Sequence, residues 1–327
     1  MAERASDYGG LLIIGDPHLE GRQPGFRKDD YPRVILDKLG WCLNYAKEYR
    51  LLPAIPGDLF DKPRDNPTWM LRRLIEMLSQ VECIGLYGNH DCADPTLCEH
   101  DSLSLLVAAT RIQLVDVDQP WRGYMNGRLV IVGGSSYRHP IPNRFDPHRD
   151  AETDEPLVVW LTHHDIIVPG YEEQGRFQPR EIDGIDLVIN GHIHRRLDDV
   201  QVGRTLWITP GNISRRSRSD ATRDHMPSVL RIDVGLDGFE RHFVEVPHQA
   251  FDEVFHDMVV DGVVDASDSA FVKGLAELQA RRTQSGAGLM TFLEQNLDQF
   301  DAAVANEVLV LAKEVTRDVE STTENDQ

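Results

Sequence analysis

Five short groups of polar residues in this sequence contain side chains that bind metal ions. They are Asp16-Pro17-His18, Asp58 with Asp61, Asn89-His90-Asp91, His163-His164-Asp165 and Gly191-His192-Ile193-His194. Carboxylate, imidazole and amide ligands together suit divalent ions such as manganese, iron or zinc. No cysteine occurs in these groups, which argues against a structural zinc site. The residue types therefore predict metal-dependent chemistry.

These groups supply more ligands than a single ion needs. Seven side chains are candidate ligands: Asp16, His18, Asp58, Asn89, His163, His192 and His194. A carboxylate can bridge two ions, and a pair held roughly 3.5–4 Å apart clamps a phosphoryl group while activating a bridging hydroxide. The set therefore predicts a dinuclear centre that hydrolyses phosphate esters.

Each group taken alone has an ordinary structural explanation. Asp-x-His is common by chance, and a histidine on a strand is more often a hydrogen-bonded core residue than a ligand. The run Gly88-Asn89-His90-Asp91 is also typical of a plain turn with Asn at a positive φ angle. The joint occurrence of the groups, each after an apolar segment, favours the functional interpretation.

The segments that precede the first three groups have the pattern of buried strands. Residues 11–14 lead to Asp16, residues 51–55 lead to Asp58, and residues 81–86 lead to Asn89. Helical spacing predicts a helix with Pro32 in its first turn, a second over 67–79 and a third over 102–109. Strand, polar tip and helix thus recur along this part of the chain.

Closely spaced strands dominate the next part of the sequence. They are predicted over 112–117, 129–132, 157–161, 187–189, 206–209, 229–234 and 243–246, with loops over 118–127 and 139–155. Helices before strands, followed mostly by strands, predict an α/β sandwich with two central sheets rather than one doubly wound sheet.

We expect a catalytic domain over residues 9–248 and a C-terminal cap or partner-binding module over 249–320. The module shows helical spacing of apolar residues in an acidic background. Residues 1–8 and 321–327 are predicted to be disordered.

The chain has 327 residues, 41% of them hydrophobic, and a formal net charge of −20. Residues 251–327 hold 5 basic and 16 acidic residues, a net charge of −11. This balance opposes non-specific adhesion to nucleic acid or anionic membranes. The local charge differs between residues 203 and 218, which contain no acid and four arginines: Arg204, Arg215, Arg216 and Arg218.

No stretch of the sequence reaches the roughly 20 apolar residues of a membrane span, and the N-terminus lacks an apolar signal core. We therefore expect a cytoplasmic protein. Its four cysteines form no C-x-x-C pair, and we expect reduced thiols; a bridge between Cys92 and Cys98 is the alternative.

The motif order Asp-x-His, Gly-Asp-x-x-Asp, Gly-Asn-His-Asp, His and Gly-His-x-His resembles the calcineurin-like metallophosphoesterase superfamily over roughly residues 11–246. The resemblance implies a four-layer α/β/β/α metallophosphoesterase sandwich with a small C-terminal helical or α+β cap. It also implies two divalent metal ions, manganese first, with iron or zinc as alternatives.

The resemblance implies a division of the ligands between the two ions. Asp16, His18 and His194 would hold one ion, and Asp58 would bridge to the other. Asn89, His163 and His192 would hold the second ion. The residues themselves leave open whether His163 or His164 binds metal, and the superfamily pattern favours His163.

Four further residues receive roles from the resemblance. His90 would be the general acid or transition-state stabiliser, since the pKa of histidine lies near neutrality, and Asp61 would orient its imidazole. Asp91 and His164 are candidates to support the metal-bound imidazoles, which usually need a partner for the other ring nitrogen.

Some segments are similar to SbcD-type DNA repair nucleases. These are Gly57-Asp58-Leu59-Phe60-Asp61, the run 209–216, although that family usually has Ser where Asn212 stands, and residues 246–251 before a smaller terminal module. The similarity implies a DNA exonuclease or endonuclease of repair or recombination, with an SbcC-type coiled-coil ATPase as partner. A homodimer is a further expectation, and no membrane is involved.

In a nuclease, Arg215, Arg216 and Arg218 would contact DNA phosphates, which position a substrate without reading its sequence. A solvated loop is the alternative for these arginines. The runner-up function is a phosphodiesterase or phosphatase for a cyclic nucleotide, a nucleotide or a phosphoprotein, which the net charge favours. A catalytically inactive binding scaffold is the third hypothesis, and the complete ligand set opposes it.

Overall fold

The computed structural model describes residues 8–24, 27–146, 155–216 and 223–256. The chain divides into a compact unit of residues 1–257 and a second unit of residues 258–327. Residues 1–7 and 321–327 of the predicted disordered termini, Arg218 and most of the predicted C-terminal module fall outside the described residues. In the part that is described, no helix is long and apolar enough to cross a membrane.

The first sheet has six strands in the order β12-β11-β1-β2-β3-β4. Its parallel part runs from β1 to β4, and β11 and β12 extend it in antiparallel pairing. The strands are β1 (Gly10–Ile13), β2 (Leu51–Ile55), β3 (Cys83–Gly85), β4 (Ile112–Leu114), β11 (Ser228–Val234) and β12 (Phe239–Glu245).

The second sheet also has six strands, in the order β5-β6-β7-β8-β10-β9. The four central strands are parallel, and both edge strands are antiparallel to their neighbours. The strands are β5 (Trp121–Met125), β6 (Arg128–Ser135), β7 (Leu157–Thr162), β8 (Leu187–Asn190), β9 (Val200–Val202) and β10 (Thr205–Ile208). The predicted two-sheet α/β sandwich is confirmed.

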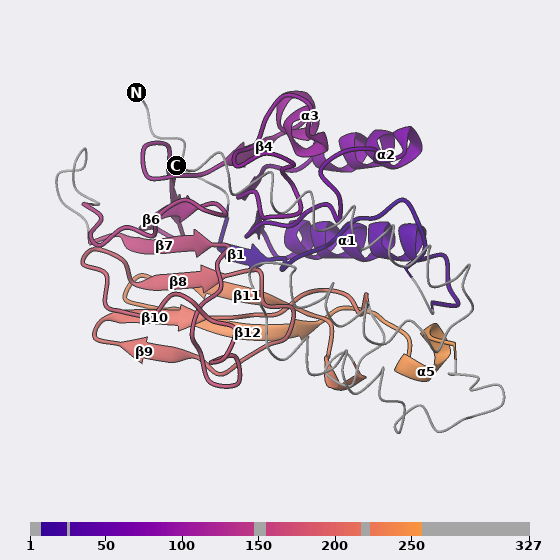
Figure 1. Ribbon diagram of the computed structural model, residues 1–327. Coiled ribbons are helices and arrows are strands. Elements are labelled where there is room, and N and C mark those ends of the chain that lie inside the picture. The colour runs from indigo at the N-terminus through magenta and orange to yellow at the C-terminus, as the bar shows by residue number, and fades with distance from the viewer. Residues whose placement is uncertain (1–7, 25–26, 147–154, 217–222, 257–327) are drawn as a thin grey trace, which may run out of the picture. The chain divides into compact units, whose positions relative to one another are not determined.

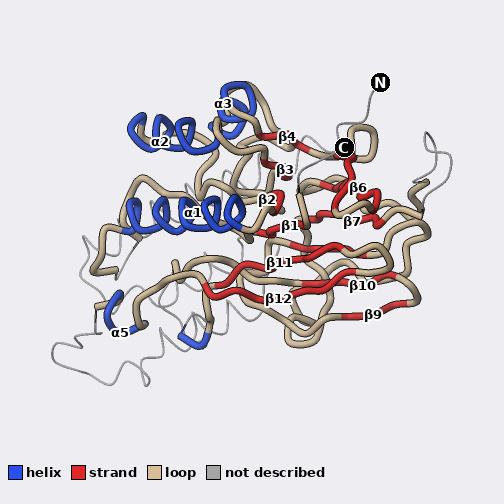
Figure 2. Tube along the Cα trace, turned by 180° about the vertical axis from the view of Figure 1, so that it is seen from behind, coloured by secondary structure: helices blue, strands red, loops and turns tan. Residues whose placement is uncertain are grey.

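Three longer helices, α1 (Tyr31–Glu48), α2 (Thr68–Leu78) and α3 (Ser102–Ala109), gather beside the first sheet (Figure 1). The view from behind shows the same arrangement and the short α5 (Phe251–Val254) beyond the end of β12 (Figure 2). The outer face of the second sheet is covered in the described residues by loop side chains such as Ile141, Ile166 and Ile182.

Strand β1 shows why its sequence is apolar at every position. Leu11 and Ile13 pack between the two sheets, whereas Leu12 and Ile14 pack against the helices. Successive side chains of a strand point to opposite faces, so a central strand covered on both faces is apolar throughout. Burial of each such side chain stabilises the fold by about 1.5–3 kcal/mol.

The predicted loop over 118–127 is wrong, because β5 lies within it. Asn126 and Gly127 join β5 to β6 with φ angles of 47° and 85°. A two-residue Asn-Gly turn of this kind is a strong hairpin signal. The edge strand β9 was also not predicted. Strand β4 ends at Leu114, earlier than expected. Strand β12 begins at Phe239, earlier than expected, because its first half contains exposed polar residues that interrupt the apolar pattern.

Candidate metal centre

The predicted ligands follow five strands that belong to both sheets. Asp16 and His18 follow β1, Asp58 follows β2, and Asn89 follows β3 in the first sheet. His163 follows β7 in the second sheet, and His192 and His194 follow β8 there. Because the carboxyl ends of parallel strands meet at one edge of a sheet, these loops bring the ligands together.

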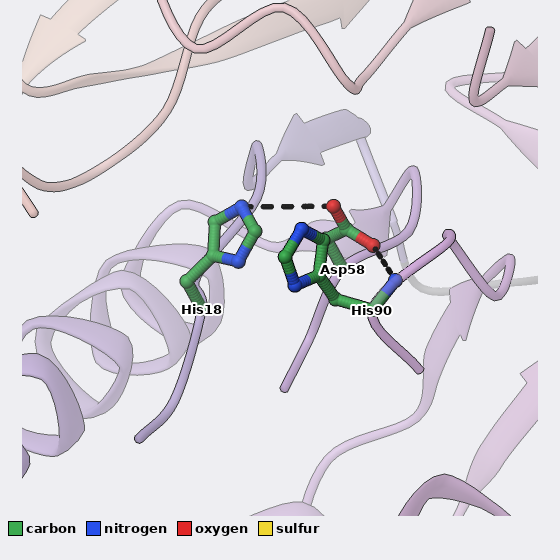
Figure 3. Close-up of side chains that lie close together, drawn as sticks. All are labelled: His18, Asp58 and His90. Atoms are coloured by element: carbon green, nitrogen blue, oxygen red, sulfur yellow. Dashed lines mark hydrogen bonds and ion pairs between the residues drawn. The ribbon is translucent and has the colours of Figure 1, made fainter. Parts of the chain in front are cut away.

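Asp58 is the central carboxylate of the site. Its Oδ2 atom lies 3.2 Å from His163 Nε2 and 3.6 Å from His18 Nε2. Its Oδ1 atom accepts the backbone N–H of His90 at 2.9 Å. Figure 3 shows His18 and the backbone nitrogen of His90 bound to different oxygens of this carboxylate. Asp58 therefore connects the loops that follow β1, β3 and β7.

Three further close contacts join the ligands to one another. Asn89 Oδ1 lies 3.2 Å from His163 Nε2 and 3.0 Å from His192 Nδ1. His18 Nε2 lies 2.8 Å from His194 Nε2. Ring nitrogens that face one another at these distances direct their lone pairs into a common space, which a cation can fill.

The donor set fits two metal ions. Two groups of three side chains have ligand atoms within 4.8 Å of one another, namely His18 with Asp58 and His90, and Asp58 with His163 and His192. Asp58 belongs to both groups, as a bridging carboxylate would. Asp16 is fully buried, and its Oδ2 atom has no hydrogen-bond partner. A buried anionic oxygen without a partner is costly unless a cation compensates it.

Hydrogen bonds fix the tautomers of two ligand imidazoles. His163 Nδ1 lies 2.8 Å from the carbonyl oxygen of Pro56, and His192 Nε2 lies 2.9 Å from Asp165 Oδ1. Both oxygens accept, so His163 Nε2 and His192 Nδ1 remain available for a metal ion. Sequence reasoning did not assign this role to Asp165, although its place beside His163 and His164 was the available signal.

The structure places His163, not His164, beside Asp58. His164 Nε2 donates to the His139 carbonyl at 2.8 Å, and its backbone N–H donates to Asn190 Oδ1 at 3.0 Å. Burial lowers the pKa of His164 to about 4. Burial therefore favours the neutral form of His164, and its hydrogen bonds hold it to the neighbouring loop.

Asp91 ties two ligand loops together. Its carboxylate accepts backbone N–H groups of Phe60 and Gly88, each at 2.9 Å, and of Leu59 at 3.3 Å. Burial, with the nearby negative charge of Asp58, raises the pKa of Asp91 to about 7. Asp91 therefore supports the site through the backbone of its loops.

His90 is bound by the backbone of Asp61. His90 Nδ1 lies 2.8 Å from the Asp61 carbonyl oxygen and 3.9 Å from Oδ1 of its carboxylate. That carboxylate pairs with Arg216, with Nη2 to Oδ2 and Nε to Oδ1 both at 2.9 Å. The predicted orientation of His90 by Asp61 thus has a main-chain contact to act through.

The expectation that Arg215 contacts DNA phosphates needs correction. Its side chain is 7% exposed. It donates to the carbonyl oxygens of His225 at 2.9 Å and Gln249 at 3.0 Å. Such a buried guanidinium is not accessible to a duplex. Arg216 keeps a side chain that is 35% exposed beside Asp61, and Arg218 lies outside the described residues.

Several ligands have an unusual backbone conformation. The φ angles of Asp16, His18, Asp58 and His192 are 34°, 47°, 49° and 69°. Positive φ in non-glycine residues costs free energy and is concentrated at functional sites. Gly57 precedes Asp58 at φ 106°, and a Cβ atom there would lie 2.3 Å from His163 Nδ1. Only glycine allows this close approach.

Electrostatics couple Asp58 to its neighbours. Burial favours protonation of Asp58, but His163 and His18 outweigh it and hold the pKa of this carboxyl well below its usual range. Burial lowers the pKa of His163, and the negative charge of Asp58 overcomes it and raises that pKa to about 9. A metal ion that binds here must displace the His163 proton.

Comparison with known proteins matches the sequence to the family model described as calcineurin-like phosphoesterase, over residues 10–196. No curated protein sequence matches the chain.

Solved structures similar to this chain share little sequence with it. The sulfate thiohydrolase SoxB of Thermus thermophilus is 14% identical with a TM-score of 0.39, over 74% of this chain and 56% of that chain. A predicted phosphoesterase of Streptococcus pneumoniae TIGR4 is 13% identical with a TM-score of 0.31, over 74% and 92%. GAP50 of Plasmodium is 12% identical with a TM-score of 0.40, over 72% and 84%. The chain thus spans little more than half of the SoxB chain.

Proposed function

The chain belongs to the calcineurin-like phosphoesterase family, and from this we propose that it hydrolyses phosphodiesters with two divalent ions, manganese by preference, held by the seven ligands. The observation that carries the proposal is the shared carboxylate of Asp58, which lies in both groups of convergent ligand atoms. The buried Oδ2 atom of Asp16 also supports the proposal, because it has no hydrogen-bond partner and a cation would compensate its charge.

The chain's own residues divide the work at such a centre. Two bound divalent ions would polarise the phosphoryl oxygens and lower the pKa of an attacking water. Asp165 keeps the Nδ1 lone pair of His192 directed at Asn89. His90 Nδ1 must carry a hydrogen, because the Asp61 carbonyl only accepts. As the doubly protonated imidazolium, His90 would give its Nε2 proton to the leaving alkoxide and would remain as the neutral imidazole with a hydrogen on Nδ1.

Hydrolysis of bis-p-nitrophenyl phosphate by the manganese-loaded protein tests this proposal. We expect two ions per chain by metal analysis, and loss of both metal and activity in Asp58→Ala. Asp183→Ala is the matched control, because this carboxylate is 65% exposed and pairs with Arg144. Fewer than two ions in active preparations, or full activity of Asp58→Ala, would contradict the proposal.

For the substrate we propose DNA, with an SbcD-type exonuclease or endonuclease activity in repair or recombination. Besides the similar segments, arginines near the ligands support a polyanionic substrate. The Arg138 guanidinium lies 5.5 Å from the centre of the Tyr137 ring, and that ring stacks at 6.3 Å on His192. Arg176 Nε lies 3.7 Å from Asp165 Oδ2. Arginines so placed could contact the phosphates of a DNA strand, and such contacts position the strand without reading its sequence.

Comparing linear DNA with small substrates separates the two candidate substrate classes. We expect Arg138→Ala to reduce DNA cleavage several-fold and to leave hydrolysis of bis-p-nitrophenyl phosphate unchanged, with the exposed Arg144→Ala as control. The net charge of −20 favours the alternative, a small-substrate phosphodiesterase or phosphatase. Cleavage of cyclic nucleotides or phosphopeptides without DNA cleavage would establish that alternative.

We also propose an SbcC-type coiled-coil ATPase as partner, a homodimeric assembly and a cytoplasmic location. These proposals rest on the similarity to SbcD-type nucleases and on the sequence composition. Co-purification from the native source tests the partner, and the mass of the purified protein in solution tests the dimer. Recovery of the chain alone, as a monomer, would contradict both.

A further inference from the structure

A second site with uncompensated positive charge lies outside the metal centre. A cavity of about 580 Å³ is lined by residues of α1 and of the segments around Arg215 and His248, and by none of the seven candidate ligands. Its volume lies within the range of small-molecule sites. Three basic residues contribute to its wall: Arg27, Lys38 and Arg215.

Two of these cations lack an acidic partner. Lys38 Nζ donates to the carbonyl oxygen of Ile213 at 3.0 Å, and Arg215 donates to two backbone carbonyls. Among the described residues, neither side chain forms an ion pair with a carboxylate. The wall has two acids: Asp29 is bound by Arg27 at 2.8 Å, and Asp37 has an exposed side chain. Lys38 and Arg215 therefore keep N–H groups that can donate to an added anion.

The electrostatic environment of Lys38 agrees with this geometry. Burial, together with the positive charges of Arg27 and Arg215, lowers the pKa of Lys38 to about 8. An anion in the cavity would relieve this repulsion, and it would favour the charged form of the amine. Buried charges are normally paired, so two unpaired cations at a cavity wall indicate a missing partner.

The wall also has an apolar part, beside the polar residues Asp37, His248 and Gln249. Trp41 and Val34 of α1 contribute to it, with Pro227, Pro247 and Val254. Ligand sites of this size combine a mostly apolar lining with a few polar anchors. An apolar or planar body beside the charged group would therefore fit the cavity better than a bare ion.

We propose that this cavity binds a phosphate monoester with a planar apolar body, of the size of a nucleoside monophosphate, at Lys38 and Arg215. The phosphate lies against the two cations, and the planar body lies against Trp41 and Val34. This binding is separate from the hydrolytic function and goes beyond it, because none of the predicted metal ligands lines the cavity.

Calorimetric titration of the manganese-loaded protein with deoxyadenosine monophosphate (dAMP) tests the proposal. We expect Lys38→Met to weaken binding at this site about tenfold or more, since a hydrogen bond to a charged group is lost. Lys38→Arg retains the charge and should restore binding. Lys47→Met is the matched control, because this lysine lies on the same helix with an exposed side chain outside the cavity.

Two further measurements complete the test. Deoxyadenosine, which lacks the phosphate, should not bind, and dAMP should change the tryptophan emission of the wild type but not of Trp41→Phe. Equal dAMP affinity of Lys38→Met and Lys47→Met, or equal binding of deoxyadenosine and dAMP, would overturn the proposal. Hydrolysis of bis-p-nitrophenyl phosphate should be the same in both lysine variants. An enzyme inactive in all forms would contradict the proposed function alone.

Discussion

Replacing Asp165 with alanine is expected to weaken metal binding about 10- to 100-fold, the usual effect of losing a group that orients a metal-bound histidine. The hydrogen bond at issue joins Asp165 Oδ1 to His192 Nε2 at 2.9 Å. The Asp165 side chain is 23% exposed, so water screens this contact only in part. Without the carboxylate, His192 can adopt the other tautomer and lose its Nδ1 lone pair.

The substitution is suited to the test because the backbone of Asp165 has separate contacts. Its carbonyl oxygen accepts the N–H groups of Arg176 at 2.7 Å and Phe177 at 2.9 Å, and alanine retains both. We therefore expect the circular dichroism spectrum to stay unchanged. The loss of affinity corresponds to about 1.4–2.7 kcal/mol, which calorimetric titration with Mn²⁺ resolves.

The weaker binding should be confined to one of the two ions. The ion held by Asn89, His163 and His192 should bind more weakly, while the affinity of the other ion stays close to that of the wild type. Activity should return at saturating Mn²⁺, because His90 and Asp58 are intact. Unchanged affinity for both ions, or activity that excess metal does not restore, would refute the orienting role of Asp165.

Four further predictions concern Gly57, His90, His225 and the bound metal ions. Gly57→Ala is expected to lower the free energy of unfolding by about 2 kcal/mol or more, measured by urea denaturation, because its Cβ would lie 2.3 Å from His163 Nδ1. His90→Ala should keep two ions by metal analysis but lose roughly 10²–10⁴ of turnover, and loss of metal would contradict its role as a proton donor. Burial lowers the pKa of His225 to about 4 in the folded protein. The unfolded chain therefore binds a proton at this residue more readily, and the free energy of unfolding should fall by about 3 kcal/mol as the pH falls from about 6.5 to about 4. His225→Gln should flatten this dependence. Removal of metal with a chelator should lower the melting temperature, as measured by calorimetry, because the ions compensate buried carboxylates such as Asp16.

The central strands could be predicted because a strand buried on both faces consists of consecutive apolar residues. Strands β1 and β7 are buried at every position, and their sequences are apolar almost throughout. Edge strands carry a weaker pattern, since β5 and β9 contain exposed residues such as Arg122 and Gln201. The Asn126-Gly127 turn was a local signal for a hairpin that includes β5, although the segment before β5 is polar.

The candidate ligands could be predicted as a set because each follows a recognisable strand. Their supporting contacts could not, because they join residues far apart in the chain. The Arg215 side chain is buried and donates to the carbonyl groups of His225 and Gln249. No local sequence pattern distinguishes it from the partly exposed Arg216. A run of arginines specifies charge, whereas tertiary packing decides which of them reaches solvent.

Strain in the ligand loops explains why backbone contacts matter so much at this centre. Each positive φ angle at Asp16, His18, Asp58 and His192 costs on the order of 1 kcal/mol or more. Such conformations persist only where surrounding bonds fix them. The His18 N–H donates to the Asp58 carbonyl at 3.0 Å, and the His192 N–H donates to Asp16 Oδ1 at 3.0 Å. The ligands thus hold one another's loops in place, so the geometry that binds metal depends on the whole set rather than on any one motif.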